Sequence, residues 1–317
     1  MQILIIVIVV LAFFSLLCAT LPVVFFNTAI KAKPRRKLIK HPPNRARAKF
    51  KNEITDFENW YFSQNIKYEH IKSLDGLSLC TQILENENSK RTVIMMHGFR
   101  AQDHSDFVGS VRFFYEMGFN VVLPHQRGHE RSEGKHLSFG YFESLDCKQW
   151  VDFVISRYGE DTEIILYGVS MGSATVMIST SLNLPRNVKF CIADCGYSST
   201  REIFSHVMCK KYHLPAFPLV NVASFICKKY AKFDIDEKTP LKSLAENTIP
   251  ILFIHGEKDK FVPCDMTYKN YKACTSEKEL LVVKDAYHAM SFLVAPDLCK
   301  SKVKEFIKKY LSKKEDL

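Results

Sequence analysis

Two patterns that would suggest zinc binding or an oxidising compartment are missing from this chain. None of its ten cysteines is spaced as C-x-x-C, and several, such as Cys191, fall inside apolar runs, where a free thiol packs as a small hydrophobic group. The chain also contains no N-x-Ser/Thr sequon. These absences argue against structural zinc and a dense disulfide framework, and they remove one sign of a secreted domain.

Charge is missing from the apolar run Ile3 to Phe26. At about 1.5 Å per residue, a helix over this run would be long enough to cross a bilayer core of about 30 Å. No basic residue precedes the run and no clear A-x-A site follows it, which favours a membrane anchor over a cleaved signal peptide. We therefore expect a single-pass anchor within residues 1–30.

Acidic residues are missing from the next stretch, Lys31 to Lys51, which carries ten Lys and Arg. This number equals the net charge of +10, and the other parts of the chain carry 34 basic and 34 acidic residues. The pattern argues against nucleic acid as a partner. It favours contact with anionic membrane lipid and predicts a catalytic domain on the cytoplasmic side, with an exported, membrane-tethered domain as the alternative. Pro34, Pro42 and Pro43 predict an extended linker over residues 31–65.

What is present from residue 66 onward is enough chain for one full core. A hairpin over Tyr68 to Ile83, turning at Asp75-Gly76, comes first, and short apolar strands then alternate regularly with amphipathic helices. Strands without a polar face predict a mostly parallel sheet covered by helices on both sides, with ligands bound at the carboxyl ends of the strands. The expected fold class is α/β over residues 66–317.

One interval breaks the alternation. More than fifty residues separate the strand that ends near Asp194 from the strand that begins at Ile249, and they are rich in apolar side chains such as Phe204 and Phe225. So long a connection is expected to be functional or structured in its own right. We predict a helical cap over about residues 197–248 that covers the active site. The alternative is an extra helix pair that packs as ordinary core.

The strongest motif is Gly168-Val169-Ser170-Met171-Gly172, between an apolar strand and a helical stretch of small residues. A G-x-S-x-G between strand and helix makes a sharp turn that exposes the serine at the carboxyl end of the strand. The motif predicts Ser170 as a nucleophile.

A serine hydroxyl needs an imidazole to take its proton. His288 follows the last predicted strand and is the preferred base. His255 and His97 also end strands, but His255 lies in the loop that we assign to the acid, and His97 heads a loop that it is expected to shape.

The carboxylate that orients the histidine is predicted to be Asp259. It lies just after a strand and between Ser170 and His288, which gives the chain order Ser, Asp, His. Three alternatives stay open, each of which also suits a turn or cap: Glu257, Asp194 and Asp285.

The negative charge that develops on the acyl oxygen needs hydrogen-bond donors. The backbone amides of Met171, directly after the nucleophile, and of Phe99, after the first parallel strand, occupy the two expected places. Both are predicted to form the oxyanion hole.

Taken together, these segments resemble the α/β-hydrolase superfamily of serine hydrolases over roughly residues 66 to 311. The segments that carry the likeness are His97-Gly98-Phe99, Arg127-Gly128-His129 with Ser132-Glu133-Gly134, the motif around Ser170, His255-Gly256 with Asp259, and His288. The likeness is greatest to the lysophospholipase-like and monoacylglycerol-lipase-like esterases. It implies an α/β-hydrolase fold without cofactor or metal, and it would place Arg127 in a loop beside the site, where we interpret it as a loop-stabilising residue.

We therefore expect a membrane-anchored serine hydrolase that cleaves carboxylic ester or thioester bonds, with a small-molecule acyl ester of lipid origin as substrate. The alternatives are a serine peptidase, an acyltransferase and a non-catalytic scaffold with the same fold. The sequence predicts no oligomeric state.

Overall fold

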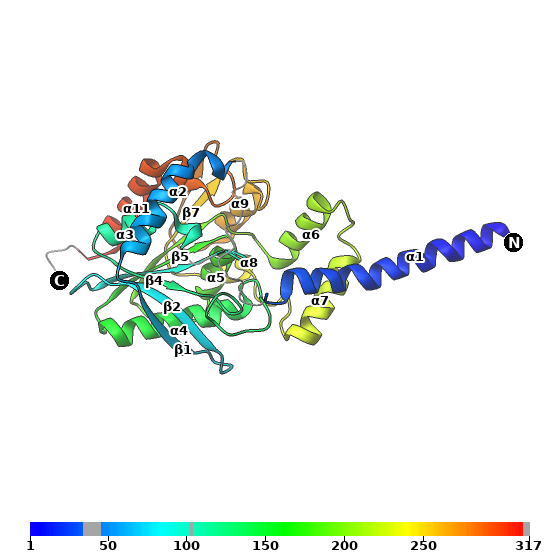
Figure 1. Cartoon of the computed structure of the whole chain (residues 1–317), viewed down its shortest axis with the longest axis horizontal. Helices are drawn as coiled ribbons and strands as arrows, with labels where there is room; N and C mark the ends of the chain where they lie inside the picture. Colours follow the sequence, from blue (N-terminus) through cyan, green and yellow to red (C-terminus); the bar gives the residue numbers. More distant parts are fainter. Residues whose placement is uncertain (34–45, 102–103, 313–317) are drawn as a thin grey trace.

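The computed structural model describes residues 1–33, 46–101 and 104–312. An eight-stranded sheet forms its centre, in the order β1-β2-β4-β3-β5-β6-β7-β8 (Figure 1). The strands are β1 (Lys67–Lys72), β2 (Ser78–Leu84), β3 (Arg91–Met96), β4 (Asn120–Pro124), β5 (Glu163–Val169), β6 (Val188–Asp194), β7 (Ile251–Gly256) and β8 (Lys278–Val283).

Strands β4, β3, β5, β6, β7 and β8 run parallel, whereas β1 and β2 pair antiparallel at one edge. All seven residues of β5 are buried, as expected for a strand covered on both faces. The predicted mostly parallel α/β sheet, with a hairpin before it, is confirmed.

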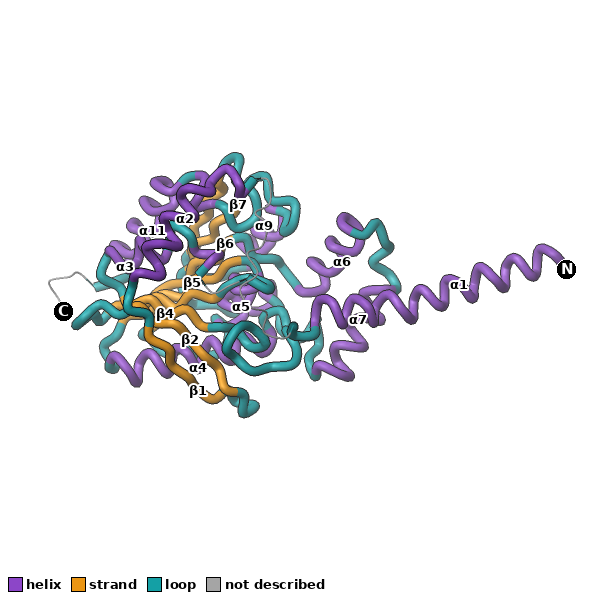
Figure 2. The backbone as a smooth tube through the Cα atoms, in the orientation of Figure 1, coloured by secondary structure: helices purple, strands orange, loops and turns teal. Residues whose placement is uncertain are grey.

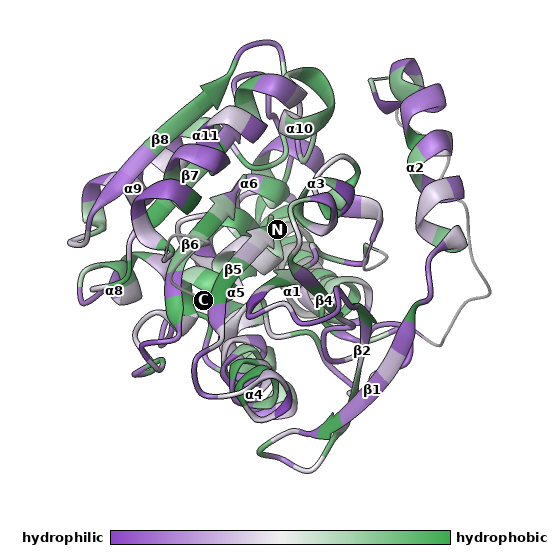
Figure 3. Ribbon diagram, turned by 90° about the vertical axis from the view of Figure 1, so that its left-hand side faces the viewer, coloured by the Kyte–Doolittle hydropathy of each residue, from purple (hydrophilic) through white to green (hydrophobic). Residues whose placement is uncertain are grey.

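Helices cover the two faces of the sheet in two groups (Figure 3). Those of the first group, α2, α3, α10 and α11, share a core with one face, and α4, α5, α8 and α9 share a core with the other. Their bounds are α2 (Lys51–Ser63), α3 (Val111–Glu116), α10 (Ser291–Val294), α11 (Pro296–Tyr310), α4 (Tyr141–Tyr158), α5 (Met171–Ser179), α8 (Pro240–Leu244) and α9 (Cys264–Ala273).

A third cluster of buried side chains lies beyond the carboxyl ends of the parallel strands. It joins α6 (Thr200–Lys211) and α7 (Leu219–Ile226), which we call the cap helices, to Phe139, Met171 and Val262 of the main body. A π-helical turn, η4 (Cys227–Ala231), continues α7. The long interval between β6 and β7 therefore folds as helices, and α6 supplies Phe204 to this cluster.

The predicted membrane anchor at the N-terminus is wrong. Helix α1 (Gln2–Phe25) forms over most of the apolar run, yet within the described ranges no helix combines the length and apolar character needed to span a membrane. Its last turn is used for packing inside the protein. Pro22, Phe25 and Phe26 are buried, and α1 lies along α7 (Figures 1 and 2). Hydrophobicity predicted the helix but not the packing of its last turn. The prediction of a single-pass membrane protein with a cytoplasmic domain, and its alternative of an exported, membrane-tethered domain, both depended on the anchor and are wrong as well.

The segment expected to be an extended linker is helical at its end. Its three prolines lie outside the described residues, but η2 (Arg47–Phe50) leads directly into α2. Phe57 and Tyr61 of α2, one turn apart on the same side, are buried in the core of the sheet. The three prolines precede α2 and give no information about its residues, which explains why the helix was not predicted.

Candidate active site

Ser170 lies at the turn from β5 into α5, with backbone angles φ 56° and ψ −114°. A non-glycine residue is strained at such a φ, and the tight turn around it holds the strain in place. A Cβ at Gly168 would lie 2.2 Å from the carbonyl oxygen of Gly172, and a Cβ at Gly172 would lie 1.8 Å from that of Met96. Only glycine fits at either position, so the motif has a steric cause.

His288 lies in the loop after β8 and faces Ser170. Its Nε2 is 2.9 Å from Ser170 Oγ, and its Nδ1 is 2.6 Å from Oδ2 of Asp259, in the loop after β7. The hydrogen positions that suit both contacts are an Nδ1–H donating to Asp259 and an Nε2 accepting from the serine hydroxyl. The structure thus brings the predicted nucleophile, base and acid into one hydrogen-bonded row.

Asp259 is held from several sides. Its Oδ1 accepts hydrogen bonds from the amides of Phe261 and Val262 at 2.9 and 3.0 Å, and Nε2 of His255 lies 3.3 Å from its Oδ2. Burial alone would raise the pKa of Asp259, but the bonds to His255 and His288 outweigh it and hold that pKa well below its usual value. The carboxylate is therefore ionised at neutral pH.

The contact between Asp259 and His288 also changes the pKa of the imidazole, in the opposite direction to that of the carboxylate. Burial lowers the pKa of His288, but the hydrogen bond and negative charge of Asp259 raise it above the usual value, with smaller contributions from Asp106 and Asp194. An imidazole with a raised pKa is a stronger base, so the carboxylate both orients the ring and favours proton uptake.

The alternative acids lie in other settings. Asp285 forms an ion pair with Lys258 at 2.5 Å, and Glu257 accepts a hydrogen bond from the Asp285 amide. Asp194 is buried and accepts a hydrogen bond from the Tyr167 hydroxyl at 3.4 Å, and burial raises its pKa to about 7. None of the three makes the contact to Nδ1 of His288 that Asp259 makes.

The two alternative bases, His97 and His255, form hydrogen bonds that hold the loops in which they lie. One ring nitrogen of His97 faces the carbonyl oxygen of Gly98 at 2.8 Å, and the other accepts from the Gln126 amide. His255 binds Thr267 and the carbonyl of Val262 while it touches Asp259. The contact from His255 to Asp259 was not predicted from the sequence.

Phe99 and Met171 both line the space next to Ser170. Among the described residues, neither backbone amide donates a hydrogen bond, whereas the neighbouring Gly98 amide is occupied by Asp106 Oδ2 at 2.7 Å. Met171 is the first residue of α5, where an amide has no partner within its helix. Neither amide therefore has a hydrogen-bond acceptor among the residues that the structure describes.

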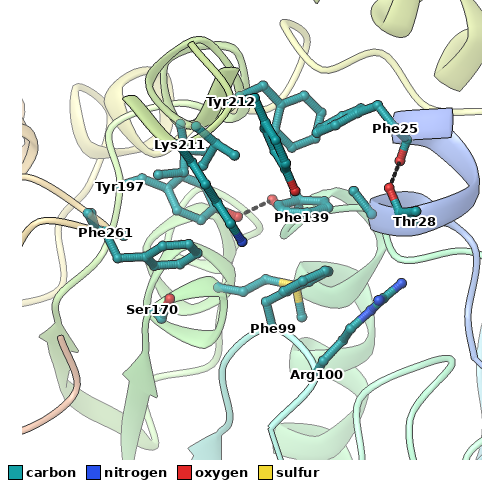
Figure 4. Close-up of a pocket in the computed structure, with 16 residues that line it drawn as sticks. Phe25, Thr28, Phe99, Arg100, Phe139, Ser170, Tyr197, Lys211, Tyr212 and Phe261 are labelled. Atoms are coloured by element: carbon teal, nitrogen blue, oxygen red, sulfur yellow. Dashed lines mark hydrogen bonds between the residues drawn. The ribbon is translucent and has the colours of Figure 1, made fainter. Parts of the chain in front are cut away.

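A pocket of about 350 Å³ opens over Ser170 between the main body, the cap helices and the end of α1 (Figure 4). Its lining is mostly apolar and aromatic, and among the residues that the structure describes it contains the cations Arg100 and Lys211 and neither Asp nor Glu. The lining residues are Phe25, Thr28, Ala29, Phe99, Arg100, Phe139, Ser170, Met171, Tyr197, Ile203, Phe204, Val207, Lys211, Tyr212, Phe261 and Val262.

Sequence reasoning missed two contributors to this pocket. Phe25, Thr28 and Ala29 come from the segment assigned to the anchor, and Phe261 comes from the loop that carries Asp259. The ring of Phe261 packs edge-on to His288, with centroids 4.9 Å apart. A signal for Phe261 was available, because it lies two residues beyond the predicted acid.

Cys195, Asp259 and His288 offer ligand atoms within 4.8 Å of one another, close enough to be examined as a metal site. Both ring nitrogens of His288 are already engaged, with Ser170 and Asp259. Burial raises the pKa of the Cys195 thiol well above its usual value, which disfavours the thiolate that a metal binds. We interpret the group as an acid and base pair beside a buried thiol.

Arg127 stabilises the loop that follows β4. Its guanidinium forms two hydrogen bonds with the Asp146 carboxylate, of 2.6 and 2.7 Å, and reaches Asp75 at 3.0 Å. This side chain therefore ties the loop to α4 and to the β1–β2 turn, which confirms the structural interpretation.

Comparisons with known proteins agree with the fold and the motif. A family model described as serine aminopeptidase, S33 matches residues 87–196, and one described as serine hydrolase (FSH1) matches residues 165–289. The first span includes Ser170, and the second includes Ser170, Asp259 and His288.

Relatives cover most of the chain. It is 27% identical over 220 residues to the uncharacterized protein YqkD of Bacillus subtilis, covering 69% of this chain and 72% of the other. It is 25% identical over 223 residues to protein bem46 of Schizosaccharomyces pombe, covering 68% of each. Among solved structures, the Pyrococcus furiosus esterase Pf2001 superimposes with a TM-score of 0.67 at 24% identity, over 89% of this chain and 99% of that one.

The sheet order and the solved structures define an α/β-hydrolase fold. With the two family models, they identify the chain as a serine hydrolase of the α/β-hydrolase superfamily.

Proposed function

We propose that this serine hydrolase cleaves carboxylic ester or thioester bonds of lipid-derived acyl substrates, with Ser170 as nucleophile, His288 as base and Asp259 as orienting acid. One observation carries the proposal. The hydrogen-bonded row from Asp259 through His288 to Ser170 ends at an apolar pocket of about 350 Å³.

In the first half of the reaction, Ser170 Oγ attacks the acyl carbonyl while His288 Nε2 takes the hydroxyl proton. The free amides of Phe99 and Met171 bind the oxygen that becomes negative; one such donor is worth about 3 kcal/mol of barrier lowering. His288 then gives its proton to the departing alcohol or thiol, and the acyl group stays on Ser170.

In the second half, His288 removes a proton from water, which attacks the acyl-enzyme at the same carbonyl. The oxyanion forms again in the same place, and collapse releases the carboxylic acid and returns the proton to Ser170. Asp259 stays ionised throughout and stabilises the imidazolium that forms twice in each cycle.

The lining of the pocket supports a lipid-derived acyl group. Phe99, Phe139 and Phe204 present aromatic surface beside Ser170, and such apolar surface binds hydrocarbon chains by removing them from water. The lipid that we propose as a partner of this protein is therefore its substrate.

The family model named for an aminopeptidase makes peptide cleavage the second candidate. A substrate with a free ammonium group would favour acidic side chains in its pocket, because a buried cation needs a negative partner. The part of the lining that the structure describes contains Arg100 and Lys211 and no carboxylate, which favours the ester reaction.

The test combines active-site labelling with turnover. The wild-type chain is expected to react with a fluorophosphonate probe and to hydrolyse p-nitrophenyl acyl esters. Ser170→Ala and His288→Ala should each lower kcat on the order of a million-fold, since removal of either group disables the unit. Aminoacyl anilides test the peptidase candidate, and added glycerol reveals acyl transfer as a glyceride product.

Two matched variants serve as controls. Ser63→Ala and His70→Ala change exposed residues of α2 and β1, and both should keep wild-type rates. A folded wild type that neither labels nor turns over any acyl ester would contradict the proposal and favour the non-catalytic scaffold.

A further inference from the structure

The segment that follows α1 forms one wall of the pocket, although it lies far from Ser170 in the sequence. We call residues 25–32 the N-terminal wall. Phe25, Thr28 and Ala29 line the same pocket as Ser170, and Phe26–Ile30 form a π-helical turn, η1. The start of the chain is therefore part of the binding site.

Backbone hydrogen bonds attach the N-terminal wall to the main body. The Leu137 amide donates to the carbonyl oxygen of Ile30 at 2.7 Å, and the Ala32 amide donates to that of Lys135 at 2.9 Å. The Arg100 guanidinium donates to the carbonyl oxygen of Lys31 at 3.2 Å, and Ile30 is fully buried. Bonds on two sides and a buried anchor residue give the wall a defined position.

A row of aromatic rings connects the N-terminal wall with the catalytic loops. The Phe25 ring meets Phe204 of α6 edge-on with centroids 4.8 Å apart, and Phe204 meets Phe139 in the same way at 4.8 Å. Phe139 stacks on Phe99 at 5.4 Å. The apolar surface is therefore continuous from the loop of the proposed oxyanion donor to the end of α1.

In Figure 4, Ser170 and the pair Phe25 and Thr28 stand at opposite ends of the pocket, with Phe139 between them. A short acyl group on Ser170 ends near Phe99, whereas a long chain continues along the rings and meets the wall. Contact at that end therefore depends on the length of the chain.

We propose that the N-terminal wall determines the specificity for acyl-chain length, with Phe25 and Ala29 in contact with the distal part of a long chain. This inference rests on the ester hydrolysis proposed above. Phe25 supplies apolar surface to the chain, and the small side chain of Ala29 leaves room for it.

Two substitutions in the full-length chain test this role. Ala29→Trp fills the far end of the pocket, and Phe25→Ala removes the ring that the chain contacts. The measured quantity is the ratio of kcat/KM for p-nitrophenyl palmitate to kcat/KM for p-nitrophenyl acetate. Each substitution should lower this ratio on the order of tenfold, as expected when a hydrophobic contact in a pocket is lost or blocked.

The control is Asn27→Ala. Asn27 belongs to the same turn and is exposed, its side chain bonds the carbonyl of Val23, and it is outside the pocket lining. This variant should keep the wild-type ratio. Ratios within about twofold of wild type in both Ala29→Trp and Phe25→Ala, with Ser170 still labelled by fluorophosphonate, would overturn the inference and leave the proposed function intact. If Ala29→Trp does not fold, Phe25→Ala decides.

A binding measurement separates the inference from the chemistry. Titration of each protein with cis-parinaric acid reports occupation of the pocket without turnover. Weaker binding to Ala29→Trp and Phe25→Ala than to wild type and Asn27→Ala supports the wall even if no ester is cleaved. Equal binding to all four proteins, or none to the wild type, overturns it.

Discussion

The floor and the roof of the pocket present different kinds of contact to a substrate. The floor consists of loops at the carboxyl ends of the parallel strands, where Ser170, Asp259 and His288 are joined by hydrogen bonds of 2.6 and 2.9 Å. The roof, made of the cap helices and the N-terminal wall, faces the pocket with apolar rings in contact, such as those of Phe25 and Phe204, although backbone hydrogen bonds also attach the wall to the main body.

This difference separates the residues that we propose for catalysis from those that we propose for substrate selection. A hydrogen-bonded row works only when every member is in place, because each group orients the next. Apolar contacts are individually weak and replaceable, so their loss lowers affinity in steps. Changes in the floor should therefore abolish turnover, and changes in the roof should redistribute it among substrates.

The largest expected effect breaks the floor at Asp259. Asp259→Asn keeps the shape of the side chain, but its amide favours the wrong tautomer of His288 and no longer stabilises the imidazolium. We expect kcat for p-nitrophenyl acetate to fall about ten-thousand-fold, as in related triads. The control Asp285→Asn removes an exposed ion pair with Lys258 and should behave as wild type. A loss smaller than about tenfold in Asp259→Asn would assign the acid to another residue.

A smaller effect is expected in the roof. Phe204→Ala removes a pocket-lining ring from α6, so kcat/KM for a long acyl ester should fall on the order of tenfold, and less for acetate. Phe225→Ala, on α7, removes a ring that is 63% exposed and absent from the lining, and should leave both rates as they are. Equal losses for both esters in Phe204→Ala would show that the roof acts on the chemistry itself.

The smallest expected effect is a displaced pH profile. Burial lowers the pKa of His288, but Asp259 raises it overall, with help from Asp106 and Asp194. The base must be neutral to accept a proton, so activity should fall on acidification around a pKa above the usual histidine value of about 6.5. Removal of the carboxylate disfavours the protonated ring, so the acid limb of residual kcat/KM in Asp259→Asn should move to lower pH. An unmoved limb would mean that another group titrates.

The sequence predicted the floor well because its determinants are local. The turn around Ser170 requires Gly168 and Gly172 for steric reasons, and both are visible in the motif. Parallel strands place their carboxyl ends at one edge, so residues that follow β7 and β8 were expected near Ser170.

The roof was predicted less completely because its contacts join distant parts of the chain. The apolar run near the N-terminus indicated a helix, but its composition does not tell whether lipid or protein covers the helix. Protein contacts hold the end of the run, where Phe25 meets Phe204 and Ile30 accepts a hydrogen bond from Leu137, whereas Ile3 to Val9 are exposed. No local pattern encodes these contacts. In the same way, α2 depends on burial of Phe57 and Tyr61 against the body rather than on its neighbours in sequence.

The placement of His288 after the edge strand β8 has a consequence for the time at which the protein becomes reactive. Ser170 precedes His288 by 118 residues, so the serine is synthesised before β8 and the loop that carries the proposed base. Because chains fold from the N-terminus as they emerge, a nascent or C-terminally truncated chain would carry an inert serine. On the proposed mechanism, hydrolysis therefore waits until β8 has been made and its loop has brought His288 to Ser170.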